Sequence, residues 1–402
     1  HTISDSRALV ERSSIRSALR AWGAPPQAVH TARVRSAGTH APAGVHALEV
    51  CLPRVCVDVA ALERAEGAAG RHSRNRLLER LSVCGDGDDA VSLGLTAMRD
   101  LLRRGGVRPE EVGHLQVGSA SLLDRSKSMK TELMALLEPG GQLDVEGVDV
   151  CGAAGGGCSL LSVASAWVRG PSWDGRWSVV VCADAAIAQP GQWPSGAAAV
   201  AVLVGPDAPL HLGLESAVEH GHAFTLCRPI GLPSMEPLAD DRFGEYATRP
   251  LVSHIRLRGE ASQPEARGYM YFGSTCDHRL RVGEDEAIRS ALTGAQEIAR
   301  FEQRVARSAW LSAHVGETHA SAACLGLAAL LLTSDDAVDY ARVHASRGGR
   351  DAGEGLLEIS RLRAVVDSTL GARLASRTPL EPAAFGVLCG RSAAHVGQFG
   401  WT

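Results

Sequence analysis

The stretch GVDVCGAAGGGCSL, residues 147–160, decides the fold of this chain. It combines a short apolar segment, a glycine-rich turn and the start of the apolar helical segment SLLSVASAWVR. A strand that turns sharply into a helix presents one side chain at the turn, and the helix N-terminus offers backbone N–H groups to a developing anion. The stretch therefore predicts the elbow of an active site. Its turn carries only alanine and glycine, which have no nucleophilic side chain.

The composition indicates a globular protein and excludes two classes of function. The chain has 402 residues, of which 45% are hydrophobic and 21% charged, with a net charge of −4. A chain without a basic surplus is not expected to contact nucleic acid directly. No apolar run reaches the length of about 18 residues that a membrane span needs. Aromatic residues make up only 4%, so we expect a core of small and branched side chains, as in layered α/β folds.

The ten cysteines do not follow a metal-binding pattern. None forms a CxxC pair or a cysteine–histidine cluster with zinc-ligand spacing, and no metal site is expected. Most lie within apolar runs, such as Cys182 in SVVVCADAA. This favours buried, reduced thiols over disulfides, and hence a reducing compartment.

Residues 1–43 differ in composition from the rest of the chain. The segment SRALVERSSIRSALRAW is rich in arginine and serine and poor in acids, which is typical of organellar transit peptides. We predict an N-terminal extension derived from a presequence, and a mitochondrial location. The alternative is an ordinary surface helix followed by the flexible linker APPQ.

Alternating strands and helices follow in two halves, 44–205 and 206–402. In the first half, the patterns predict strands at 44–52, 114–120, 177–188 and 197–205, helices at 57–67, 90–106 and 124–139, and a polar region at 70–89. In the second half, they predict strands at 211–220, 266–274, 341–350 and 355–362, and helices at 284–310 and 318–332. This alternation indicates layered α/β architecture.

Several blocks together resemble 3-hydroxy-3-methylglutaryl-CoA synthase, the condensing enzyme of the thiolase-like superfamily. They include VGSASLLDRSKSMKTELMALLE at 117–138, DVEGVDVCGAAGGG at 144–157 and SWDGRWSVVVCADAAIA at 172–188, of which the blocks with DRSKSMKT and SWDGR are specific. The resemblance extends over residues 44 to 400. It implies a five-layered thiolase-like α/β fold of two similar halves, the second shortened at its end, and a homodimer.

The family's reaction uses a cysteine that acetyl-CoA acetylates, a glutamate that moves protons and a histidine that orients acetoacetyl-CoA. Aligning the blocks places Ala154, Ala120 and Gly273 at these three positions. The resemblance therefore implies a chain without catalytic or cofactor-binding residues, and we predict that it is not an enzyme. Asp124, Lys127, Lys130, Asp184 and Pro229, which match the family, are interpreted as scaffold.

The resulting hypothesis is a structural or accessory subunit of a larger mitochondrial assembly, such as a respiratory complex or the mitoribosome. Its partners would be other protein subunits, in a homodimer or heterodimer. Three alternatives stay open. The nucleophile has moved to Cys151 or Cys158, with His319 or His278 as base; the chain binds an acyl-CoA without reacting, with arginines of segment 71–76 at the phosphates; or it regulates an active paralogue.

Overall fold

The structure is a computed structural model. It describes residues 42–70, 73, 78–122, 124, 126–151, 156–185, 196–212, 226–227, 236–237, 307–316, 318–333 and 352–385. The predicted extension up to residue 41, the turn 152–155, the strands predicted at 266–274 and 341–350 and most of the helix predicted at 284–310 lie outside the described residues.

The described elements alternate as the sequence predicts. The strands are β1 (Ala43–Cys51), β2 (Val55–Asp58), β3 (Arg80–Val83), β4 (Val112–Ser119), β5 (Asp149–Cys151), β6 (Trp177–Ala185), β7 (Ala197–Pro206), β8 (Leu210–His211), β9 (Leu226–Cys227), β10 (Glu236–Pro237) and β11 (Thr378–Pro379). The α-helices are α2 (Val59–Glu66), α4 (Ala90–Gly105), α5 (Met129–Leu133), α6 (Gly156–Arg169), α11 (Arg307–Val315), α12 (Ala322–Thr333) and α14 (Ala352–Ala375). Short 3₁₀ turns cover Pro109–Glu111, Met134–Leu136 and Glu138–Gly140.

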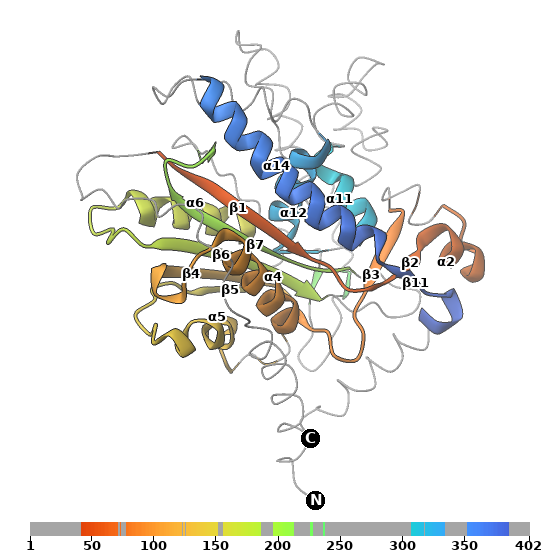
Figure 1. The fold of residues 1–402 in the computed structure, drawn as a ribbon. Coiled ribbons are helices and arrows are strands. Elements are labelled where there is room, and N and C mark those ends of the chain that lie inside the picture. The colour runs from red at the N-terminus through yellow and green to blue at the C-terminus, as the bar shows by residue number, and fades with distance from the viewer. Residues whose placement is uncertain are drawn as a thin grey trace, which may run out of the picture.

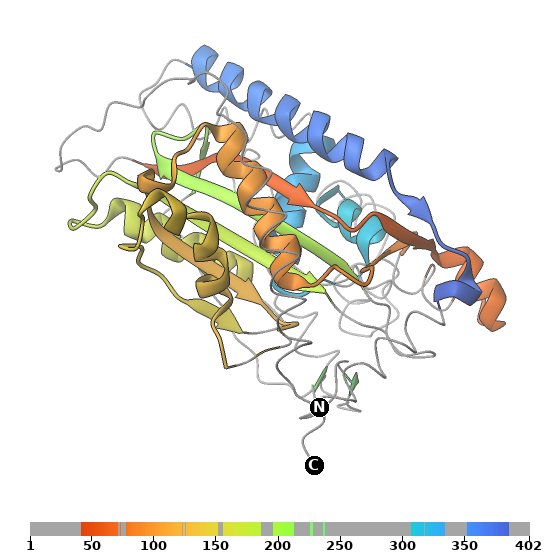
Figure 2. The same ribbon diagram turned by 60° about the horizontal axis from the view of Figure 1, so that its bottom comes forward.

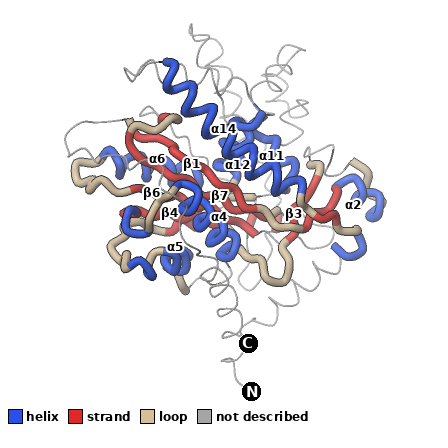
Figure 3. Tube along the Cα trace, in the orientation of Figure 1, coloured by secondary structure: helices blue, strands red, loops and turns tan. Residues whose placement is uncertain are grey.

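A six-stranded mixed sheet with the order β5-β4-β6-β7-β1-β8 forms the centre. Strand β4 runs parallel to β5 and β6, whereas β7 runs antiparallel to both β6 and β1. Helices α4 and α5 cover one face of the sheet, and α6, α12 and α14 cover the other (Figures 1 and 3). Strands buried on both faces are continuously apolar, which explains the runs in β6 and β7. The α/β prediction is confirmed.

The C-terminal part of the chain returns to the N-terminal part. Helix α14 lies along the β1 end of the sheet (Figure 2). Beyond it, β11 pairs in parallel with β2 in a second sheet of order β11-β2-β3. A small core of its own supports this sheet, in which Val57, Leu81 and Phe385 are buried.

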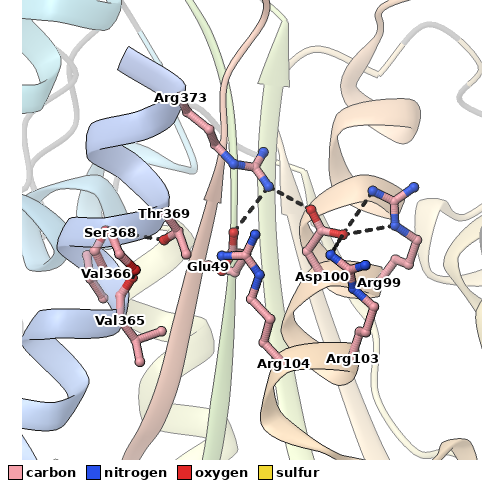
Figure 4. Close-up of polar contacts among 10 residues, drawn as sticks. All are labelled: Glu49, Arg99, Asp100, Arg103, Arg104, Val365, Val366, Ser368, Thr369 and Arg373. Carbon is pink, nitrogen blue, oxygen red and sulfur yellow. Dashed lines mark hydrogen bonds and ion pairs between the residues drawn. The ribbon is translucent and has the colours of Figure 1, made fainter. Parts of the chain in front are cut away.

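A buried charge cluster attaches α14 to the central sheet (Figure 4). Nη2 of Arg373 lies 3.1 Å from a carboxylate oxygen of Glu49 on β1 and 2.7 Å from one of Asp100 on α4. The Glu49 and Asp100 side chains are 2% and 6% exposed. Burial raises the pKa of Glu49 above its ordinary value, although the charges of Arg104 and Arg373 oppose this rise.

The helix predicted at 90–106 is confirmed as α4, because its sequence carries an N-terminal cap and a C-terminal glycine. The side chain of Asp89 accepts from the backbone N–H of Ser92, whose hydroxyl in turn accepts from the N–H of Asp89. Gly106 ends the helix with φ of 63°. This reciprocal cap and the left-handed glycine stop are the expected termini of a helix.

Two predicted elements are corrected by the structure. The strand predicted at 355–362 is wrong, since these residues belong to α14. Leu362, Val366 and Leu370 follow one another at the four-residue spacing of a helix and are buried against the sheet. The helix predicted at 124–139 is shorter and interrupted: α5 begins only at Met129, where Asp149 accepts the backbone N–H groups of Met129 and Lys130, and two 3₁₀ turns follow it.

Strand β3 lies within the predicted polar region 70–89, and β2 occupies the start of the helix predicted at 57–67. Asp58 begins α2 instead, by accepting the N–H of Ala61. None of the described helices is both long and apolar enough to cross a membrane.

Candidate active site

The residues on either side of the predicted elbow turn, Cys151 and Gly156, lie at the end of β5 and at the start of α6, beside the carboxyl ends of the parallel strands β4 and β6. In the register of the sheet, Ser119 at the end of β4 is opposite Cys151 at the end of β5, and Gly118 is opposite Cys182 of β6. Helix α6 starts at Gly156, five residues after Cys151. The carboxyl edge of parallel strands is where α/β sheets bind ligands, so this edge is the candidate site.

The carboxylate of Asp184 joins three segments at this edge. One oxygen accepts the backbone N–H of Ala120 at 2.9 Å. The other accepts the N–H and the hydroxyl of Ser321 at 2.8 and 2.9 Å. Asp184 is fully buried, so it holds the end of β4 and the turn before α12 onto β6. Asp184 was predicted only to be scaffold, although a lone carboxylate in an apolar run indicates a buried group that needs hydrogen-bond donors.

The N-termini of α6 and α12 lie against each other beside Asp184. A Cβ atom added to Gly157 would be 2.7 Å from the carbonyl oxygen of Ala320 and 2.9 Å from Cβ of Ala323. This explains why a glycine occupies the first turn of α6. Two helix N-termini at one point provide a region of positive potential at the edge of the sheet.

We expect Gly157→Ala to lower the free energy of unfolding by about 1–3 kcal/mol, since its Cβ would meet a backbone oxygen that side-chain rotation cannot move. Urea unfolding measures the loss. Gly87→Ala is the matched control, because a Cβ at Gly87 has no neighbour within 4 Å. Equal stability of the two variants would contradict the close helix contact.

The structure places the predicted site residues unevenly. Ala120 is half-buried directly after β4 and donates its N–H to Asp184. Cys151 is exposed at the end of β5, and His319 is 6% exposed in the turn before α12. Cys158 belongs to the first turn of α6, and its side chain is outside the description. The residues that lie wholly outside the described part are Ala154, Gly273, His278 and Pro229.

The blocks that carry the family resemblance contact one another. Nζ of Lys130 donates to the carbonyl oxygen of Val145 at 2.8 Å. Nη1 of Arg176, in the SWDGR block, donates to the carbonyl oxygen of Asp144 at 2.7 Å. Lys127 pairs with Glu132 at 2.7 Å. Lys130 and Arg176 thus hold the segment before β5, whereas the Lys127–Glu132 pair lies within a single block. The interpretation of the two lysines as scaffold stays a prediction.

A buried polar chain lies beneath α6. His114 on β4 is 3% exposed and stacks on Trp167 of α6 with ring centroids 4.8 Å apart. Its Nδ1 is 2.7 Å from Oγ of Ser178, and its Nε2 is 2.8 Å from Nε2 of Gln116. Burial lowers the pKa of His114 to about 4, against a smaller opposing effect of Glu146. The imidazole is therefore neutral at pH 7.

This histidine should make stability depend on pH. Its pKa is lower in the folded chain than in the unfolded chain, so the unfolded state binds the additional proton. The contribution of the neutral His114 side chain to the free energy of unfolding is complete above about pH 6.5. It is lost as the pH falls towards 4, by up to about 1.4 kcal/mol per pH unit. Urea unfolding of the wild type and of His114→Gln from pH 7 to 4.5 measures it. The variant should show a shallower slope; parallel curves would contradict the assignment.

The described cysteines differ in their ability to act as nucleophiles. Cys51, Cys56, Cys182 and Cys324 are buried. Burial raises the pKa of Cys51 to about 11 and raises that of Cys84 above its ordinary range. Cys151 is the exposed member of the described set. Within the same residues, no group of three or more His, Cys, Asp or Glu side chains is arranged to hold a metal ion.

A buried mixed sheet with helices on both faces, and two helix N-termini that meet at its carboxyl edge, is a thiolase-like α/β fold. Solved structures share this fold. An HMG synthase of the curacin biosynthetic pathway matches with a TM-score of 0.68 at 18% identity, over 88% of this chain and 89% of that chain. An HMG-CoA synthase from Bacillus subtilis matches with a TM-score of 0.66 at 18% identity, over 88% of this chain and 89% of that chain.

Residues 40–209 match the family described as hydroxymethylglutaryl-coenzyme A synthase N terminal. A hydroxymethylglutaryl-CoA synthase of Zymoseptoria tritici is 41% identical over 212 residues, which are 51% of this chain and 45% of that protein. The human cytoplasmic hydroxymethylglutaryl-CoA synthase is 36% identical over 204 residues, which are 50% of this chain and 39% of that protein. The match spans less than half the length of these curated relatives. Over this segment, the chain is similar to the N-terminal part of hydroxymethylglutaryl-CoA synthases.

The prediction that the chain is not an enzyme is wrong. Relatives with 41%, 39% and 37% identity are named hydroxymethylglutaryl-CoA synthases, and a solved structure of the same fold is an HMG-CoA synthase complexed with CoA. These relatives point to an enzyme. The assignment of Ala154, Ala120 and Gly273 to the three family positions stays a prediction, because two of these residues lie outside the described part of the chain.

Proposed function

We propose that the chain accepts an acyl group from an acyl-CoA thioester on a cysteine of the elbow, Cys151 or Cys158. The exposed position of Cys151 at the carboxyl edge of the sheet is the observation that carries this proposal. The similarity of residues 40–209 to proteins named hydroxymethylglutaryl-CoA synthases supports it. The elbow residue predicted from the alignment is an alanine, so the nucleophile has to be one of its neighbours.

The proposed step is a thioester exchange. The cysteine sulfur attacks the carbonyl carbon of the acyl-CoA, and a new carbon–sulfur bond forms. The bond to the CoA sulfur then breaks, and the departing thiolate takes up the proton that the cysteine lost. Negative charge develops on the carbonyl oxygen in between. The N–H groups at the N-terminus of α6 would stabilise this charge.

His319 is a candidate for the proton transfer. It lies in the turn before α12, which Asp184 holds through Ser321. Imidazole changes its protonation near neutral pH, whereas the Asp184 carboxylate already accepts three hydrogen bonds. His319 is buried at 6% exposure and therefore directed into the protein rather than into solvent.

Incubation of the purified full chain with acetyl-CoA, followed by intact-mass and peptide mass spectrometry, tests the proposal. We expect one acetyl group on Cys151 or Cys158, lost in Cys151→Ser or in Cys158→Ser. Cys84→Ala is the control and should be acetylated like the wild type, since burial raises the pKa of the Cys84 thiol. No acetyl-enzyme with acetyl-CoA or with longer acyl-CoA thioesters, or acetylation that both serine variants retain, would overturn the proposal.

We also propose that the chain works within a larger mitochondrial protein assembly, as a homodimer or with other subunits. The arginine- and serine-rich extension supports the location. Exposed apolar side chains support protein contacts: Leu143, Val148 and Val163 are 73%, 60% and 46% exposed on the segment before β5 and on α6. Native size in a mitochondrial extract, with mass spectrometry of co-migrating proteins, tests this. Migration as a lone monomer would contradict it.

A further inference from the structure

Two fully buried thiols lie in contact between the sheet and the helix layer. Sγ of Cys182 on β6 is 4.0 Å from Sγ of Cys324 on α12. Both residues have 0% exposure. They are 142 positions apart in the sequence, so the fold alone brings them together. No spacing rule for cysteines would have paired them.

The thiol pair lies directly beside the hydrogen bonds that organise the candidate site. Cys182 precedes Asp184 by two residues on β6, and Cys324 follows Ser321 by three residues. The two segments joined by the Asp184–Ser321 hydrogen bonds are therefore the ones that the thiols connect. Glycines leave room around the first sulfur, since Cβ atoms at Gly118 and Gly157 would each be 3.6 Å from Sγ of Cys182.

We propose that Cys182 and Cys324 form an intramolecular disulfide when the protein meets a peroxide. One thiol gives up its proton and attacks a peroxide oxygen, which yields a sulfenic acid and a first water. The second thiol attacks the sulfenic sulfur, the sulfur–sulfur bond forms and a second water leaves. The two sulfurs together lose two electrons, and hydrogen peroxide is reduced to two waters. The inference does not depend on the proposed acyl transfer.

The geometry sets what the reaction requires. A disulfide has its sulfurs about 2.0 Å apart, so the sulfurs must approach by about 2 Å through side-chain rotation and a small shift of α12. The oxidant gains access when the first turn of α12 opens locally. Once formed, the bond holds α12 covalently on β6, next to the turn that Asp184 binds, and closes a loop of more than a hundred residues.

The test is oxidation of the native full chain with hydrogen peroxide, followed by alkylation in denaturant without reductant and peptide mass spectrometry. We expect a Cys182–Cys324 cross-linked peptide, reversed by reductant, and a rise in Tm of the oxidised protein. Cys324→Ala and Cys182→Ala should each lack both changes. Cys56→Ala removes another buried thiol and should behave like the wild type.

The exposed thiol of Cys151 reports the oxidant dose inside the same sample. If Cys182 and Cys324 are both alkylated as thiols after a dose that has fully oxidised Cys151, the proposal is overturned. Pairing of either cysteine with a different partner would also overturn it. So would a cross-link that forms as readily in denaturant as in the native protein, because then the fold does not direct it.

Discussion

Replacement of Arg373 by methionine is expected to lower the free energy of unfolding by about 3–5 kcal/mol. The side chain of methionine keeps much of the packing of the arginine stem but removes the charge shared by Glu49 and Asp100. Both carboxylates are almost completely buried, at 2% and 6% exposure, so they would be left close together with reduced compensation. Urea unfolding followed by circular dichroism at pH 7 measures the loss.

The matched control is Arg361→Met, on the exposed face of the same helix. This change should stay within about 0.5 kcal/mol of the wild type, as surface substitutions usually do. Adding Glu49→Gln to Arg373→Met should restore part of the loss, because one buried charge is then removed. A loss below about 1 kcal/mol for Arg373→Met would mean that solvent compensates the two acids.

Asp184→Asn is expected to cost about 3 kcal/mol, the second large effect. Asparagine has nearly the same shape, but its NH₂ group can only donate. This NH₂ group would face either the backbone N–H of Ala120 or the backbone N–H and hydroxyl of Ser321. In the wild type, these donors bind the carboxylate oxygens of Asp184. One buried N–H group at least then loses its acceptor, and the charge that strengthens the other bonds is gone.

Amide hydrogen exchange tests this second prediction locally as well as globally. The N–H groups of Ala120 and Ser321 should exchange faster in Asp184→Asn, whereas those in the middle of α4 should change only with global stability. Asp86→Asn, in an exposed loop, is the control. Unchanged protection at both amides would show that another acceptor holds the turn.

Periodicity and caps were sufficient to predict the central sheet and α4. The strands β4, β6 and β7 are apolar because helices cover both faces, and such runs are visible without a structure. The strand prediction at 355–362 was wrong because these eight residues are too few to show a helical period. Only when the pattern is followed to Leu370 does the helical spacing of Leu362, Val366 and Leu370 become clear.

The glycine-rich stretch correctly predicted a strand that leads into a helix, since β5 ends at Cys151 and α6 begins at Gly156. The turn between them lies outside the described residues, so the elbow itself stays a prediction. The role of Asp184 was missed because its partner Ser321 is 137 positions away, and no local pattern encodes such a contact. The absence of three family side chains, at Ala154, Ala120 and Gly273, led to the prediction that the chain is not an enzyme, whereas the relatives point to an enzyme.

The return of α14 and β11 to the N-terminal strands has a consequence for synthesis. Glu49 leaves the ribosome 324 residues before Arg373, its ion-pair partner. At about 5–20 residues per second, this interval lasts on the order of 15–60 s. During it, the β1 end of the sheet has neither its covering helix nor its counter-charge, and β2 lacks its parallel neighbour. We therefore expect the nascent N-terminal half to expose this edge of the sheet until α14 has been synthesised.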